Sequence, residues 1–332
     1  MRILFVSPRY RPHVGGVEHV VGSVAERLAS AGHDITVVAG EPGIDAPREE
    51  AINGVRVVRW PTFAPGGAYH VPRMRGALAR LLEAEARRSD AVHIHSAHAV
   101  LPVYAGLILR GKARLVFSPH YHGGGHTPLR DLLWRLAWRK SVAEVVEASA
   151  AIHTVSKVEA DRLTAHFPAS AGKIAVIPNG VDEDVLRHKW RGADSDYAIY
   201  AGRLEKYKNV EEAAGLARRL GLRLVAVGDG PLRGRLVRLP GVEVKPSMPR
   251  GDYLDVLAGA RYAINLSSME AFSVFIAEAL AMGTPALVSE VVARALEAEV
   301  EGAVGPALLV RRAPVKTWGE VAPMYLELYR RV

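Results

Sequence analysis

Short apolar stretches rich in valine and isoleucine recur at regular intervals through the first half of the chain. Such near-continuous runs are typical of strands that are buried on both faces of a sheet. Segments with apolar residues at helical spacing lie between them, most clearly residues 17–32, where Gly32 provides a C-terminal stop. The expected strands are RILFVSP, DITVVAG, VRVVRW, AVHIHS, RLVFSPH, AIHTVS and IAVIPNG.

The pattern restarts after a polar stretch, HKWRGADSD, so residues near 185–196 are the expected linker. Strands alternating with helices indicate an α/β fold with doubly wound parallel sheets. Ligands bind such sheets beyond the carboxyl ends of the strands, so we expect a cleft between the two domains to hold the functional site. The second series of expected strands is YAIYAGR, RLVAVGD, VEVKPS, YAINLSS, TPALVSE and PALLVR.

Composition narrows the possible chemistry. A length of 332 residues suits two domains of about 150 residues, each with its own core. The absence of cysteine excludes disulfides, zinc fingers and thiol catalysis. No apolar run reaches the ~18 residues that span a bilayer, and the first residues lead directly into a strand without the pattern of a signal peptide. We therefore expect a cytoplasmic protein.

The chain is basic, with a formal net charge of +8, and most of the excess lies in residues 1–180. A one-sided basic surface suggests an anionic partner, whereas a solvated basic face explains the charge equally well. The segment RDLLWRLAWRK, residues 130–140, interleaves Trp134 and Trp138 with arginine and lysine. It is either an amphipathic helix on an anionic membrane surface or a helix whose tryptophans pack in the core. No nucleic-acid-binding motif is present, so we expect no such partner.

Two places in the first half carry candidate chemistry. Gly15 and Gly16 follow the first strand and open the first helix, where a tight turn and a phosphate-binding helix start are both possible. Histidines gather at two strand ends, and among them His120 is best placed to line the groove as a hydrogen-bond donor. A metal site is the alternative, although no carboxylate stands at ligand spacing. These histidines are His93, His95, His98, His120, His122 and His126.

In the second half, YAIYAGRLEKYKN places Arg203 directly after a strand and Lys208 five residues later. Two cations on one loop suit a diphosphate, and they would neutralise its charge as a leaving group. The following VAVGDGPLRGRL contains a Gly-Asp-Gly-Pro turn that we expect to be structural. Glu270 and Glu278 lie in SSMEAFSVFIAEALAMGTP, and Glu278 stands among apolar residues, so its charge needs a partner.

These motifs, in this order, resemble the retaining GT-B glycosyltransferases of family four, also called glycosyl transferases group 1. The resemblance runs nearly end to end, through GGVEHVV, DAVHIHS, FSPHYHG, AIHTVS, IPNGVD, AGRLEKYKN, VGDGPLR, SSMEAFSVFIAEALAMGTP and TWGEVAPMYLELYRR. It implies two Rossmann-like domains, over residues 1–184 and 185–314, with a last helix over 315–332 that returns to the first domain.

The resemblance also implies the activity, which is transfer of a hexose from a nucleoside-diphosphate sugar with retained anomeric configuration and without an essential metal or other cofactor. The acceptor is unknown, either lipid-linked or a small molecule, and contact with an anionic inner membrane face is possible. By position, His120, Arg203, Lys208 and Glu270 would act on the diphosphate and the transferred sugar. Gly15, Gly16, Gly202, Phe272, Ser273 and Glu278 would bind the donor, with Glu278 on the ribose.

Two departures from the family pattern stand out. Ser273 replaces a usual glycine, and residues 291–300, VVARALEAEV, replace a segment with two glycines and a glutamate by what we expect to be uninterrupted helix. The missing glycines favour, as an alternative function, a non-catalytic sugar-nucleotide-binding or regulatory protein. A nucleotide-sugar epimerase is a second alternative, although its motifs fit AGRLEKYKN less well.

Overall fold

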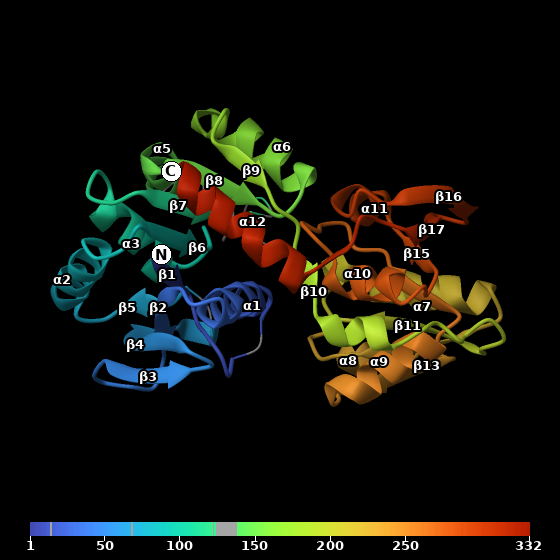
Figure 1. The fold of residues 1–332 in the computed structure, drawn as a ribbon. Helices are drawn as coiled ribbons and strands as arrows, with labels where there is room; N and C mark the ends of the chain where they lie inside the picture. Colours follow the sequence, from blue (N-terminus) through green and yellow to red (C-terminus); the bar gives the residue numbers. More distant parts are fainter. Residues whose placement is uncertain (14, 68, 122, 124–137) are drawn as a thin grey trace. The chain divides into compact units, whose positions relative to one another are not determined.

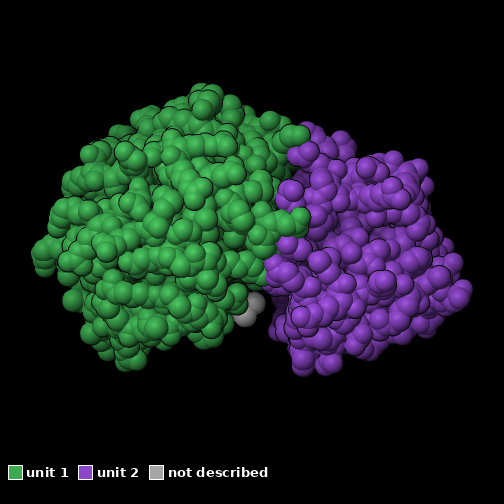
Figure 2. Space-filling view, viewed as in Figure 1, with its two compact units in different colours: residues 1–178, 318–332 green, residues 179–317 purple. Residues whose placement is uncertain are grey.

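The computed structural model describes residues 1–13, 15–67, 69–121, 123 and 138–332. The chain divides into two compact units, which are coloured separately in Figure 2. Unit 1 comprises Met1–Pro178 and Trp318–Val332, and unit 2 comprises Asn179–Thr317. Each unit has a mainly parallel sheet with helices on both faces, which confirms the predicted α/β, doubly wound fold class.

Unit 1 is built on one sheet with the strand order β3-β4-β2-β1-β6-β7-β8-β9, and β5 pairs with β4. All seven strands expected from the apolar runs are present. The sequence pattern missed β3 and β5, because β3 is a polar, exposed edge strand and β5 has only two residues. The strands are β1 (Arg2–Ser7), β2 (Asp34–Glu41), β3 (Arg48–Ile52), β4 (Val55–Phe63), β5 (Val71–Pro72), β6 (Ala91–His95), β7 (Leu115–Ser118), β8 (Ala151–Thr154) and β9 (Ile174–Val176).

Alternate residues of the unit 1 strands face two separate hydrophobic cores. One core is covered by α1 (Gly16–Ser30) and α12 (Trp318–Arg331). The other is covered by α2 (Arg75–Ala86), α3 (Val100–Leu109) and α5 (Arg139–Ala148), with Leu163 of α6 (Lys157–His166). The last helix, α12, therefore packs against α1 within unit 1, as Figure 1 shows. Unit 1 also contains the short 3-10 helices η1 (Pro65–Gly67) and η3 (Pro168–Ser170).

Unit 2 has a sheet in the order β13-β12-β11-β14-β15-β17-β16. Its helices α7 (Val210–Arg219) and α8 (Arg233–Leu236) cover one face, and α9 (Arg250–Gly259), α10 (Val274–Ala281) and α11 (Glu290–Ala295) cover the other. The strands are β11 (Tyr197–Ala201), β12 (Arg223–Val227), β13 (Val242–Lys245), β14 (Tyr262–Asn265), β15 (Ala286–Val288), β16 (Glu299–Val304) and β17 (Ala307–Arg312), and β10 (Gly180–Val181) pairs separately with β18 (Lys316–Thr317).

The boundaries between the units differ from the expected ones. The expected linker, residues 185–196, lies inside unit 2, because β10 pairs with β18 and Val185 of η4 (Glu183–Arg187) is buried in the unit 2 core. Trp190 is also held there, since its indole N–H donates to the carbonyl of Ala260 at 2.9 Å. The chain passes from one unit to the other at residues 178–179 and 317–318.

The expectation of uninterrupted helix over residues 291–300 is wrong. Helix α11 ends at Ala295, and Glu297 adopts a left-handed conformation with φ of 50°. The chain then forms β16, an exposed edge strand that pairs antiparallel with β17. Pairing with β17 therefore overrides the helical propensity of the alanines and glutamates in this stretch.

Within the part of the chain that the structure describes, no helix combines the length and apolar character needed to cross a bilayer.

Candidate functional site

The strand order of unit 2 reverses between β11 and β14, which are paired in parallel. The loops at the carboxyl ends of two such strands diverge and leave a crevice where ligands bind. Residues 202–209 follow β11 and residues 266–273 follow β14. The two sequence motifs with Arg203, Lys208 and Glu270 therefore lie on the two loops that border this crevice.

Close backbone packing shapes the first of these loops. Gly202 has φ of 147°, which favours glycine, and its N–H donates to the carbonyl of Val227 at 2.9 Å. A Cβ at Gly228 would clash with the carbonyl oxygen of Gly202. The N–H of Leu204 donates to the carbonyl of Asp229 at 2.8 Å. The Gly-Asp-Gly-Pro turn thus supports the loop that carries Arg203.

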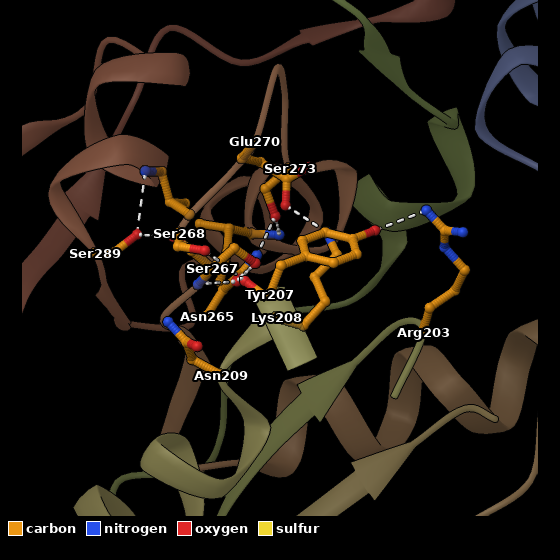
Figure 3. Close-up of polar contacts among 12 residues, drawn as sticks. Arg203, Tyr207, Lys208, Asn209, Asn265, Ser267, Ser268, Glu270, Ser273 and Ser289 are labelled. Atoms are coloured by element: carbon orange, nitrogen blue, oxygen red, sulfur yellow. Dashed lines mark hydrogen bonds and ion pairs between the residues drawn. The ribbon is translucent and has the colours of Figure 1, made fainter. Parts of the chain in front are cut away.

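The two predicted cations of this loop make different contacts (Figure 3). Lys208 Nζ lies 2.7 Å from Glu270 Oε2, and both side chains are only about 15% exposed. Arg203 is 68% exposed; it lies 3.0 Å from Glu205 and donates to the Tyr207 hydroxyl at 2.7 Å. Both cations lie within 6 Å of the centre of the Tyr207 ring. The structure therefore brings Lys208 and Glu270 into direct contact and places Arg203 at the hydroxyl group of Tyr207.

The β14–α10 loop is fixed by a buried asparagine. Asn265 Oδ1 accepts from the hydroxyl and the backbone N–H of Ser267, and its Nδ2 donates to Ser273 Oγ at 2.9 Å. The two loops are joined directly, since Asn209 Nδ2 donates to the carbonyl of Leu266 and Ser268 N–H donates to the carbonyl of Tyr207, each at 2.9 Å. Hydrogen bonds therefore hold the two loops together at this edge of the sheet.

Ser273, the first departure from the family pattern, caps α10. Its Oγ accepts from the N–H of Ile276 at 3.4 Å, so the hydroxyl holds the helix start and Asn265 together. Phe272 packs, partly buried, against the core beneath it. Ser289, which caps α11 just before the second departure, is tied to the same loop, because its hydroxyl donates to the carbonyl of Ser267 at 2.7 Å.

Glu278 has the partner that its apolar surroundings require. Its Oε1 accepts from Arg250 at 2.5 Å and its Oε2 accepts from the Tyr253 hydroxyl at 2.6 Å. Arg250 in turn makes two hydrogen bonds of 3.0 Å to Asp184. Burial raises the pKa of Glu278, while Arg250 and Tyr253 oppose that rise. Glu278 therefore belongs to a separate cluster with Arg250, Tyr253 and Asp184, and it does not contact Glu270.

The remaining predicted residues belong to unit 1. Gly15 precedes α1 in an extended conformation, and Gly16 begins the helix. A Cβ at Gly16 would meet nothing within 4 Å, so the helix start borders open space. His120 follows β7 with φ of 47° and is partly exposed. Its Nε2 lies 3.2 Å from Nδ1 of His95.

A series of buried hydrogen bonds connects the sheet of unit 1 to α12. His153 Nε2 donates to the carbonyl of Ile177 at 2.8 Å, so its Nδ1 accepts from Ser118 at 2.6 Å. Ser118 then accepts from His93 Nε2 at 2.6 Å, and His93 Nδ1 accepts from the Tyr329 hydroxyl at 2.7 Å. Burial lowers the pKa of both histidines, to about 4 for His153. These histidines are neutral structural groups.

The structure describes only some of the remaining predicted histidines and only part of the basic segment, residues 130–140. His122, His126 and residues 130–137 lie outside the described residues. Within those that are described, no group of three or more histidines and carboxylates is arranged to hold a metal. Trp138 packs against the unit 1 core and donates its indole N–H to the carbonyl of Ala97 at 2.7 Å, which fits the core-packing alternative for this residue.

Several residues of the site escaped sequence reasoning. Tyr253 and Arg250 bind Glu278, and Asp184 binds Arg250; the one available signal was the need of the Glu278 carboxylate for a partner. Nothing in the sequence indicates which distant arginine supplies it. Asn265 closes a buried strand, a position where a polar residue indicates a role in the following loop. Tyr207 contacts both predicted cations, and the sequence carries no signal for that contact.

Comparisons with known proteins agree with this architecture. Residues 14–185 match the family model described as Glycosyltransferase Family 4, and residues 195–319 match that of Glycosyl transferases group 1. The GDP-mannose-dependent alpha-mannosyltransferase of Mycolicibacterium smegmatis is 28% identical, over 86% of this chain and 79% of its own length. A glycogen synthase of Mycobacterium tuberculosis is also 28% identical, over 88% and 78%.

Solved structures show the same fold at low identity. Sucrose-phosphate synthase from Thermosynechococcus elongatus aligns with a TM-score of 0.73 and 17% identity, over 99% of this chain and 98% of that one. HepE from Anabaena, solved in complex with UDP, aligns with a TM-score of 0.63 and 16% identity, over 99% and 90%. The chain belongs to glycosyltransferase family 4, because one family model matches more than half of its length and its fold is that of these glycosyltransferases.

Proposed function

We propose that this protein transfers a hexose from a nucleoside-diphosphate sugar to an acceptor, with retention of anomeric configuration. The observation that carries the proposal is the group of charges at the β11–β14 switch point, where Lys208 and Glu270 form an ion pair beside Arg203. Such a crevice combines cations for a diphosphate with a carboxylate for sugar hydroxyls. Family membership supports the same chemistry.

Each charged residue has a role in this proposal. Lys208 and Arg203 bind the diphosphate and stabilise the charge that develops on it as the sugar leaves. Glu270 accepts hydrogen bonds from the transferred sugar, and its ion pair with Lys208 orients both side chains before the donor binds. Glu278 binds the ribose, because a carboxylate oxygen that already accepts one hydrogen bond has a second lone pair for a hydroxyl. In unit 1, Gly16 and His120 contact the donor sugar or phosphate.

GDP-mannose is the first donor to test, since three relatives that are 28% identical are named GDP-mannose-dependent mannosyltransferases. The acceptor is lipid-linked or a small polyhydroxylated molecule. Transfer needs no metal, because the two cations supply the charge that a divalent ion would otherwise provide. Activity should therefore persist in excess EDTA.

A panel of GDP-, UDP- and ADP-sugars tests the proposal. The matching donor should raise the melting temperature and be consumed in the presence of acceptor, since a ligand bound only by the native state stabilises it. NMR of the product should show the anomeric configuration of the donor. Affinity without turnover would support a non-catalytic binding protein, and conversion of the donor sugar without any acceptor would support an epimerase.

A further inference from the structure

His95 lies at the carboxyl end of β6, next to His120. Its side chain is fully buried. One face of its ring stacks on Phe5, with centroids 5.6 Å apart and planes at 20°, and the ring of His93 lies 4.0 Å away. The ring of His120 meets it edge to edge, with centroids 5.5 Å apart and planes at 24°. His95 is therefore held rigidly between the core and His120.

The sheet register explains why these two histidines meet. His95 pairs with Ser118 across β6 and β7, and His120 lies two residues beyond Ser118, just past the end of β7. His120 adopts a left-handed backbone conformation there, with φ of 47°. The resulting contact joins His95 Nδ1 and His120 Nε2 at 3.2 Å.

One of these two nitrogens must donate and the other must accept, because both rings are neutral. Burial lowers the pKa of His95 well below its usual range and that of His120 to about 3. If His120 donated, His95 would carry its own proton on Nε2. That atom is buried and has no hydrogen-bond partner among the described residues, so an N–H there would be orphaned. Buried orphaned N–H groups are rarer in proteins than unused acceptors.

We propose that His95 is a positioning residue, which donates from Nδ1 to His120 Nε2 and so fixes the proton of His120 on Nδ1. His120 then presents a neutral N–H donor at the ring edge that faces away from His95, where it meets a hydroxyl or ring oxygen of the bound sugar. This inference rests on the proposed function for the identity of that ligand. The hydrogen bond between His95 and His120 does not depend on the proposed function.

The direction of the bond predicts opposite effects for two similar substitutions. In His95→Asn, the amide N–H occupies the place of the Nδ1–H, so it still donates to His120. In His95→Asp, a carboxylate there can only accept, which forces the proton of His120 onto Nε2 and raises the pKa of that ring. His95→Phe removes the bond and keeps the stacking on Phe5.

His93→Phe is the matched control. It removes a buried histidine from the same strand, two residues away, whose hydrogen bonds go to Ser118 and Tyr329 and not to His120. It should lower stability without changing the tautomer of His120. Circular dichroism of each variant establishes that it is folded.

Long-range ¹H–¹⁵N correlation spectra of the full chain with labelled histidine read the tautomer directly, and comparison with His120→Ala assigns the His120 signals. We expect a protonated Nδ1 for His120 in the wild type, in His95→Asn and in His93→Phe, and a protonated Nε2 in His95→Asp. A protonated Nε2 in the wild type, or the same tautomer in the Asn and Asp variants, would overturn the inference.

Kinetics then connect the tautomer to the reaction. We expect kcat to fall about tenfold to a hundredfold in His95→Asp, with a smaller loss in His95→Asn and donor KM within about twofold in both. Equal losses in the two variants would overturn the positioning role. If His120→Ala transfers sugar as fast as the wild type, or if no donor is turned over, the proposed function fails, and the spectra still decide the direction of the bond.

Discussion

Removal of Arg250 should destabilise unit 2 by leaving Glu278 as a buried charge. The Glu278 side chain is 6% exposed, and Arg250 and Tyr253 supply its two hydrogen bonds. Loss of one partner of a buried ion pair costs about 3–5 kcal/mol. The Arg250 side chain is 38% exposed, so water replaces it in part, and we expect about 2–3 kcal/mol for Arg250→Met.

A double-mutant cycle isolates this effect. Glu278→Gln removes the charge, so the pair of substitutions together should be more stable than Arg250→Met alone, by about 2 kcal/mol. Asp184→Asn is the control, because it loosens Arg250 and leaves the contact with Glu278 in place. Hydrogen exchange read by mass spectrometry on the α9 and α10 peptides measures the opening of unit 2 separately from that of unit 1.

The dependence of stability on pH tests the same buried charge of Glu278. In Arg250→Met the folded-state pKa of Glu278 rises further above its unfolded value, because one of the two groups that oppose burial is gone. The stability of the variant should therefore recover as pH falls through that raised pKa, when the carboxyl group takes up a proton. Equal stability of Arg250→Met and wild type at pH 7.5, or a double variant no more stable than Arg250→Met, would refute the reasoning.

Two further predictions concern single residues. Ser273→Ala should lower the free energy of unfolding by about 1–2 kcal/mol in urea denaturation, because it removes the α10 cap and leaves the Asn265 amide without its acceptor; unchanged stability would contradict the capping role. His153, with its pKa lowered to about 4, should stay neutral in the folded state between pH 8 and 5. Because the unfolded chain binds that proton near pH 6.5, stability should fall with pH below 6.5 by up to about 1.4 kcal/mol per unit for this residue; an NMR titration midpoint of the His153 ring near 6.5 would contradict it.

The sequence pattern predicted the buried strands and the first helix because their apolar residues report burial directly. Residues such as those of β1 and β11 are apolar on both faces and cannot lie elsewhere. The edge strands β3 and β16 were missed for the same reason, since most of their side chains are exposed and carry no burial signal. These two segments are strands only because each pairs antiparallel with a neighbour, β3 with β4 and β16 with β17.

The sequence predicted which motifs form the candidate site, and it did not predict which of their side chains contact one another. Arg203, Lys208 and Glu270 follow strands, so their loops could be placed at the carboxyl edge of a sheet. The ion pair between Lys208 and Glu270 spans 62 residues and depends on the way the two loops meet. Likewise the contact between His95 and His120 follows from the register of β6 and β7, which the sequence alone does not contain.

The central claim is that Arg203 and Lys208 bind the diphosphate of the donor. The rate of sugar transfer by variants that lack these charges tests it most directly. Arg203→Ala and Lys208→Ala should each lower kcat/KM by a factor on the order of a hundred, and the double variant should show no measurable transfer, because no other group of the proposed site neutralises the leaving diphosphate. Arg218→Ala, an exposed arginine in the last turn of α7, is the control and should behave as wild type. Wild-type transfer by the double variant would contradict the account.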